Sequence, residues 1–176
     1  MIFYLLSPIF YFLLCAPSAQ QLPVVEPTAG MVITQSVKVK PGVYRLPAAG
    51  GAPILAVRGA GIVVDFQGAV LEGADPESDP DGYAGTAVLV DGGDRVTISN
   101  AVIRGYKNAI VARGSSNLHL THNDLSHNWK QRLWSLVEHE SLLDWMSYHS
   151  NEKDEWLQFG GAIYLVDCDN AEIDHN

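Results

Sequence analysis

The sequence predicts an all-β fold in which short strands wind into a coil and successive coils stack through parallel pairing. Residues 86–103 and 108–125 align at an offset of 22 residues, with apolar positions on apolar positions and Gly92 on Gly114. Each copy holds three short runs of alternating apolar residues, separated by Gly, Asn, Asp and Ser. Three strands in each 22-residue repeat, stacked about 4.8 Å apart, are typical of a parallel β-solenoid. A sandwich would not repeat its turn chemistry at one period.

Two further copies extend this pattern, which predicts which side chains stack. Residues 162–176 repeat the second copy after 53 residues, one period plus 31, and residues 54–71 form a diverged earlier copy. Alternation places Val88, Val90, Val96, Ile98 and Ile103 inward, with Ile110, Ala112, Leu118, Leu120 and Leu125 stacked on them. Val88, Ile110 and Ile163 should therefore form one inward row.

The net charge and the N-terminal segment indicate which partners the protein has and where it is located. The 176 residues hold 11 Lys and Arg against 20 Asp and Glu, a net charge of −9, so we expect no nucleic-acid partner. Residues 1–14 are almost wholly apolar and small residues follow, which predicts a signal peptide over 1–19, although no basic residue precedes it. An uncleaved anchor and a mis-assigned start are the alternatives. A cleaved protein would be secreted, periplasmic or on the cell surface, without a stable membrane span.

The repeat resembles the right-handed parallel β-helix proteins of the pectate-lyase-like superfamily. Its form, Gly/Ala-Ile-x-Val-x-x-Ser-x-Asn-Val-x-Ile-x-x-Asn, recurs through most of residues 32–176 apart from the insertion, and residues 36–46 look like the first strand and turn of such a helix. The resemblance implies a β-helix over 30–176, with Asn123 and Asn176 stacked as an internal ladder. Because the chain stops after a strand with no capping segment, we expect it to be an N-terminal fragment.

The resemblance implies either of two functions. One is a secreted carbohydrate-active protein: a polysaccharide lyase, hydrolase or epimerase, or a polysaccharide-binding protein. The other is a non-catalytic surface or periplasmic solenoid that serves adhesion or assists a metal site. The sequence does not decide whether the protein is an enzyme.

Two long connections at one corner of the coil bracket residues 104–107. The acidic loop, residues 72–85, carries carboxylates at alternate positions, which makes it a candidate calcium site or else a solvated, proline-stiffened turn. These carboxylates belong to Asp75, Glu77, Asp79 and Asp81. The insertion, residues 129–159, has helical apolar spacing and holds all four tryptophans. Its helix could pack on an outward row formed by Leu89, Val111 and Tyr164, or its aromatic residues could line a sugar groove. The candidate substrate-binding residues are Trp129, Trp156 and Tyr164.

Two polar groups are candidates for chemistry. The repeat places His119 beside Glu172 and Thr121 beside Asp174 on an outward face, where a carboxylate would raise the pKa of the imidazole and favour acid–base catalysis. A solvated polar face explains the same residues. Arg104 and Lys107 would meet the acidic groups of a polysaccharide lying between the two long connections. His122 and His175 also align, and we expect them to be turn residues.

Overall fold

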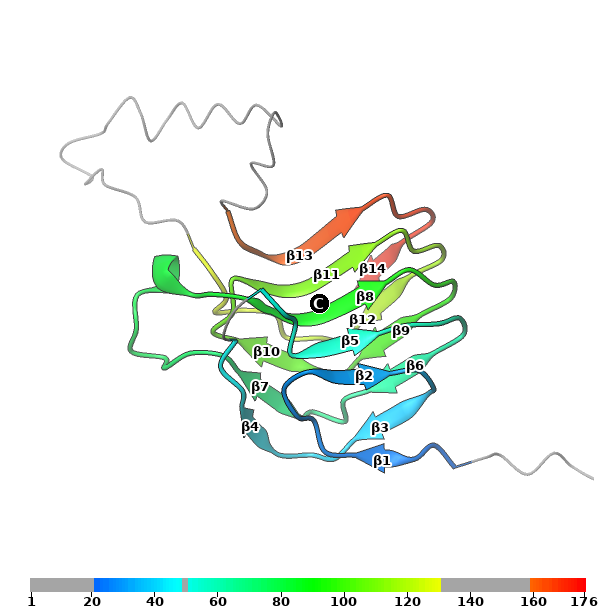
Figure 1. The fold of residues 1–176 in the computed structure, drawn as a ribbon, viewed down its shortest axis with the longest axis horizontal. Coiled ribbons are helices and arrows are strands. Elements are labelled where there is room, and N and C mark those ends of the chain that lie inside the picture. Colours follow the sequence, from blue (N-terminus) through cyan, green and yellow to red (C-terminus); the bar gives the residue numbers. More distant parts are fainter. Residues whose placement is uncertain (1–20, 49–50, 131–158) are drawn as a thin grey trace, which may run out of the picture.

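The strands of the protein form three sheets (Figure 1). Within each sheet the strands are parallel and are stacked along one direction. The computed structural model describes residues 21–48, 51–130 and 159–176. The six-stranded sheet contains, in spatial order, β1 (Val24–Val25), β3 (Val37–Val39), β6 (Val63–Asp65), β9 (Thr97–Ser99), β12 (His119–Thr121) and β14 (Glu172–Asp174). The five-stranded sheet contains β2 (Met31–Ile33), β5 (Leu55–Val57), β8 (Thr86–Asp91), β11 (Asn108–Arg113) and β13 (Gly161–Val166). The three-stranded sheet contains β4 (Val43–Arg45), β7 (Val70–Glu72) and β10 (Val102–Arg104).

The order in which the chain visits these sheets is consistent with a parallel β-solenoid. From β8 it passes to β9 in the six-stranded sheet and β10 in the three-stranded sheet, and then returns beside β8 as β11. We call one such passage a coil. Within the described residues every strand pair is parallel, and the one helical element is a short 3₁₀ turn, η1 (Pro80–Gly82). The all-β, parallel part of the prediction is confirmed.

The strand register follows the predicted repeat. Ile110 pairs with Val88 on one side and with Ile163 on the other, so the predicted row exists. The ten residues predicted to point inward all lie in one apolar core between the sheets, and none is more than 7% exposed. Complete burial of a Val, Leu or Ile side chain contributes about 1.5–3 kcal/mol, so rows of this kind hold the coils together.

The corner after the six-stranded sheet repeats one backbone conformation from coil to coil. Asn100, His122 and His175 occupy equivalent positions and have φ of 57°, 55° and 50°. The next residue turns back into the coil, and there Asn123 donates from Nδ2 to Asn176 Oδ1 at 2.8 Å. The asparagine ladder is confirmed, and His122 and His175 are corner residues as expected.

The predicted outer row of the five-stranded sheet is present, and one of its members is buried. Leu89, Val111 and Tyr164 do stand in register, but Val111 is only 3% exposed. It is not part of the core between the sheets, so its burial is on the outer side. This burial means that Val111 itself offers little surface to a ligand; whether a helix of the insertion packs on this row stays a prediction, because residues 131–158 lie outside the described residues.

Two of the predicted segments lie mostly or wholly outside the described residues. The signal peptide at 1–19 is one, and the helical part of the insertion, with Trp156, is the other. In the described part of the chain we find no helix with the length and apolarity needed to cross a membrane.

Candidate functional site

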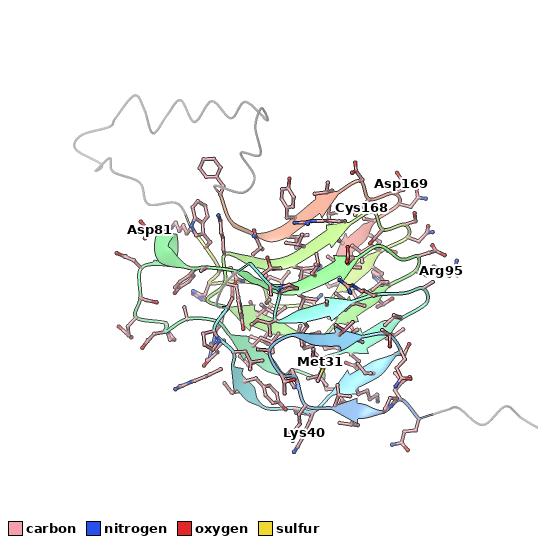
Figure 2. The ribbon with its side chains drawn as sticks, in the orientation of Figure 1. Met31, Lys40, Asp81, Arg95, Cys168 and Asp169 are labelled. Carbon is pink, nitrogen blue, oxygen red and sulfur yellow. The ribbon has the colours of Figure 1, made fainter. Side chains whose placement is uncertain are left out.

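The acidic loop and the first residues of the insertion meet at one corner of the solenoid. The Trp129 indole Nε1 donates to the backbone oxygen of Asp81 at 3.0 Å, and Trp129 also packs edge-on against Phe159, with ring centroids 6.0 Å apart. Asp81 lies at the η1 turn, on the opposite side of the molecule from Arg95 (Figure 2). The two long connections are on the same side, as the repeat predicts. Because they touch, Trp129 bridges the space between them.

Beneath the acidic loop, a buried carboxylate lies between two arginines. Parallel pairing of the three-stranded sheet puts Arg45, Glu72 and Arg104 in one row across neighbouring coils. Arg45 Nε donates to Glu72 Oε2 at 3.2 Å, and Arg104 donates to Glu72 Oε1 from Nε at 3.1 Å and also from Nη2. Glu72 is 8% exposed, and these contacts, that with Arg104 foremost, lower the pKa of its carboxyl below the usual value.

Both arginines keep part of their surface in solvent. The Arg45 side chain is 86% exposed and that of Arg104 is 42% exposed. Glu72 balances only one of these two positive charges. The row can therefore hold the arginine side chains in place while it leaves donors for a further anion.

Two cavities adjoin this row, and they share Ala74 and Pro76 of the acidic loop. The larger, which we call the arginine cavity, has a volume of about 330 Å³. Its described lining consists of Ala74, Pro76, Pro80, Tyr83, Arg104, Gly105 and His127. The smaller, of about 240 Å³, is lined by Arg45, Pro47, Glu72, Gly73, Ala74, Asp75 and Pro76. The described lining of the arginine cavity contains no carboxylate, although the chain carries a net charge of −9.

A buried tyrosine supports this corner from within the coil. Tyr106 is fully buried, and its hydroxyl donates to the backbone oxygen of Leu46 at 2.9 Å. Burial raises the pKa of Tyr106 far above its usual value, so the hydroxyl stays protonated and serves as a donor. Gly73 packs on its ring: an added Cβ would lie 2.6 Å from the ring carbons, so the position has no room for a side chain.

The four carboxylates of the acidic loop do not gather around a common point. Asp75 Oδ1 accepts from the backbone N–H of Glu77 at 3.0 Å, which stabilises a local turn. Among the described residues, a group of three potential metal-ligating side chains is formed only by His119, Glu172 and Asp174. The loop carries the residue types for calcium, but this structure does not bring them together as ligands.

The other predicted site residues lie in three different places. Arg104 belongs to the three-stranded sheet, whereas Lys107 is not among the described lining residues of the arginine cavity, although its backbone binds both the acidic loop and Gly161. Tyr164 lines a separate cavity of about 110 Å³ beside Phe159. His119, Glu172 and Asp174 come together on the six-stranded sheet, in the predicted register.

Several residues of this corner were missed at the level of sequence. No motif pointed to Arg45, Glu72, Tyr83 or His127. For Glu72 a signal was available, because Glu72 and Arg104 both end the third strand of their coils. Asn128 was missed as well. Its Oδ1 accepts from Tyr106 N at 3.1 Å, and its Nδ2 donates to Ile103 O at 2.7 Å. Its position 22 residues after Tyr106, at the end of a repeat, was the available signal.

In comparisons with known proteins, no protein family, curated protein or solved structure matched the chain.

Proposed function

We propose that the protein is an exported right-handed parallel β-helix protein of the pectate-lyase-like kind, and that it binds acidic polysaccharide at the arginine cavity. The observation that carries the proposal is the lining of this cavity, in which Arg104 and His127 accompany Tyr83 and two prolines, without a carboxylate among the described residues. The stacked parallel sheets support the fold, and the apolar leader at 1–19 supports export.

The lining suits a charged sugar for two physical reasons. The guanidinium of Arg104 can present paired N–H donors to a sugar carboxylate, and Glu72 holds that side chain in position from below. The exposed Pro76 and Pro80 offer apolar surface to the C–H faces of a sugar ring, whereas Tyr83, which also lines the cavity, is mostly buried. A volume of about 330 Å³ lies at the lower end of the range for small-molecule pockets, so we expect it to hold one sugar residue of a longer chain.

The proposal is for binding rather than hydrolysis, and the lining of the cavity explains that choice. Hydrolysis of a glycosidic bond normally requires two carboxyl groups that flank it. Within the described residues the arginine cavity offers none, and Glu72 in the neighbouring cavity is occupied by two arginines. A binding site needs only the donors and the apolar surface that this corner provides.

The test is titration of the full chain with a soluble oligomer of galacturonate and with a neutral glucan oligomer of the same length. We expect the acidic oligomer to bind and Arg104→Gln to weaken it at least tenfold, because the paired donors are lost. Arg58→Gln is the matched control: Arg58 is also an exposed arginine, paired with Asp91 at 3.1 Å on a different sheet. Equal binding of both oligomers, or equal losses in the two variants, would contradict the proposal.

A further inference from the structure

We propose that His119, Glu172 and Asp174 form a binding site for a divalent first-row transition metal on the outer face of the six-stranded sheet. Each offers one ligand atom, an imidazole nitrogen or a carboxylate oxygen, and the three atoms all lie within 4.8 Å of one another. This site is on a different sheet from the arginine cavity and does not depend on the proposed binding of polysaccharide.

The position of these side chains follows from the strand register. His119 on β12 pairs with Glu172 on β14, and Thr121 pairs with Asp174. The residue between them on β12, Leu120, is fully buried in the core, so its neighbours on the strand project from the opposite face. Residues far apart in sequence are thus held on adjacent parallel strands, about 4.8 Å apart, by the pairing itself.

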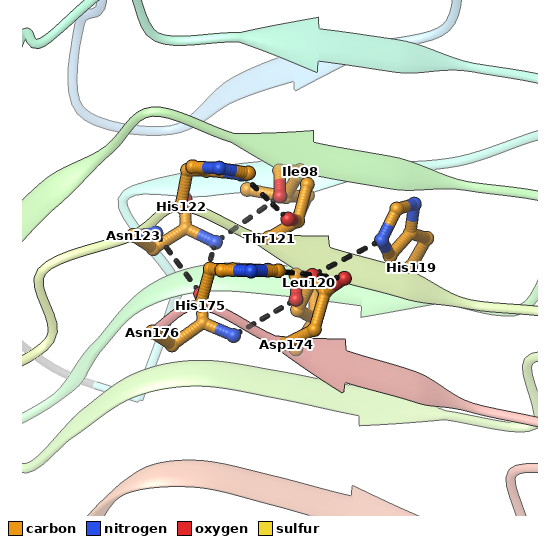
Figure 3. A network of polar contacts seen from close by, with 9 residues as sticks. All are labelled: Ile98, His119, Leu120, Thr121, His122, Asn123, Asp174, His175 and Asn176. Atoms are coloured by element: carbon orange, nitrogen blue, oxygen red, sulfur yellow. Dashed lines mark hydrogen bonds and ion pairs between the residues drawn. The ribbon is translucent and has the colours of Figure 1, made fainter.

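Neighbouring groups orient Asp174 toward this site (Figure 3). Its Oδ1 lies 3.3 Å from His119 Nε2, and its Oδ2 lies 3.3 Å from His175 Nδ1. The His175 ring stacks on His122 at a centroid distance of 4.8 Å and an interplanar angle of 8°, and His122 Nδ1 lies 2.7 Å from the Thr121 hydroxyl.

Glu172 supplies the third ligand and a reason for a cation to bind. It is exposed, and within the described part of the chain no hydrogen bond or ion pair engages its side chain. It shares one face of β14 with Asp174, so two carboxylates lie close together beside the His119 imidazole. A divalent cation between them would relieve the repulsion of the carboxylates and replace the contact between His119 and Asp174.

The donor set selects the class of metal. One imidazole nitrogen and two carboxylate oxygens suit Zn²⁺ and its first-row neighbours, whereas Ca²⁺ takes six to eight oxygens. Zinc lies about 2.0–2.2 Å from such ligands, which places pairs of ligand atoms roughly 3.3–3.5 Å apart. From separations of up to 4.8 Å the donors would close by about 1.5 Å at most, which partly exposed side chains on a fixed backbone can do by small rotations.

The experiment is calorimetric titration of the tag-free full chain with ZnCl₂ at neutral pH. We expect one Zn²⁺ per chain, and at least tenfold weaker binding in His119→Gln and in Glu172→Gln. The matched controls are His127→Gln and Glu77→Gln, which remove the same side-chain types from the arginine cavity and the acidic loop and should leave zinc affinity unchanged. Circular dichroism of each variant checks that the β-sheet content is retained.

Three outcomes would overturn the proposal. The first is the absence of saturable zinc binding by the unaltered chain. The second is an equal loss in the site variants and the controls, which would indicate non-specific binding to an acidic protein. The third is a loss in His122→Gln with none in His119→Gln, which would place the ion at the stacked imidazoles instead.

Discussion

Replacing Asn123 with alanine should destabilise the solenoid by about 2–4 kcal/mol. The side chain is 3% exposed and makes three hydrogen bonds. Its Oδ1 accepts from Ala101 N at 3.0 Å, and its Nδ2 donates to Ile98 O at 3.1 Å and to Asn176 Oδ1 at 2.8 Å. Ala101 and Ile98 are themselves buried, so alanine leaves two backbone groups without this partner in an apolar setting. Each such group costs about 1–3 kcal/mol, and relaxation of the corner should keep the total below the upper sum.

The assay is urea unfolding followed by circular dichroism, with Asn108→Ala as the matched control. Asn108 is a half-buried asparagine at the start of β11, and in the described residues its side chain makes no hydrogen bond. The control should lose less than about 1 kcal/mol, as is usual for substitutions that leave no buried group unpaired. If the two variants have equal free energies of unfolding, the ladder does not stabilise the fold and the reasoning is refuted.

Three more substitutions test the corner below the acidic loop. The pKa of Glu72 is lowered in the folded protein, so its ion pairs stabilise the fold above the usual carboxyl pKa of 4.5, and this stabilisation is lost as the pH falls below it. The free energy of unfolding, measured in urea between pH 6 and pH 3, should therefore depend less on pH in Glu72→Gln than in the unaltered chain. Tyr106→Phe removes the 2.9 Å bond to Leu46 and should cost about 1 kcal/mol in the same assay at neutral pH, whereas an unchanged free energy would mean that water replaces that bond. Gly73→Ala puts a Cβ 2.6 Å from the Tyr106 ring and 2.7 Å from the Gly105 backbone oxygen, and it should lower stability by about 1–3 kcal/mol. Gly82→Ala, with nothing within 4 Å of the added Cβ, should have little effect, and equal stabilities would show that both neighbours of Gly73 move aside.

The register could be predicted from sequence because parallel stacking repeats the same environment in each coil. Val88, Ile110 and Ile163 occupy one position of the repeat, and each is apolar because its neighbours above and below are apolar. The same logic placed His119 beside Glu172 without any knowledge of the structure. Period and alternation together fix which residues become neighbours, and here they did so across an insertion of 31 residues.

The repeat could not predict features that arise between a regular coil and an irregular one. Glu72 stands 32 residues before Arg104, not 22, because the acidic loop intervenes. Because Glu72 is charged, the sequence predicts that it belongs to the exposed acidic loop. In the structure two arginines offset the cost of burying its charge, and only the register of β4, β7 and β10 brings them near. Val111 is a similar case: alternation gives its direction, but not what lies on the outer side of the sheet.

In both proposed sites parallel pairing aligns polar side chains, but the balance of charge differs between them, so an experiment can separate the two sites. In each, side chains from equivalent places in different coils are aligned by parallel pairing, so a polar row forms wherever neighbouring coils carry complementary groups. On the three-stranded sheet the row is Arg45, Glu72 and Arg104, where two cations surround one anion. On the six-stranded sheet His119 stands between Thr97 and Glu172, and the anions outnumber the fixed cations. The first row therefore favours an added anion and the second an added cation, so a variant of either should leave the ligand of the other in place.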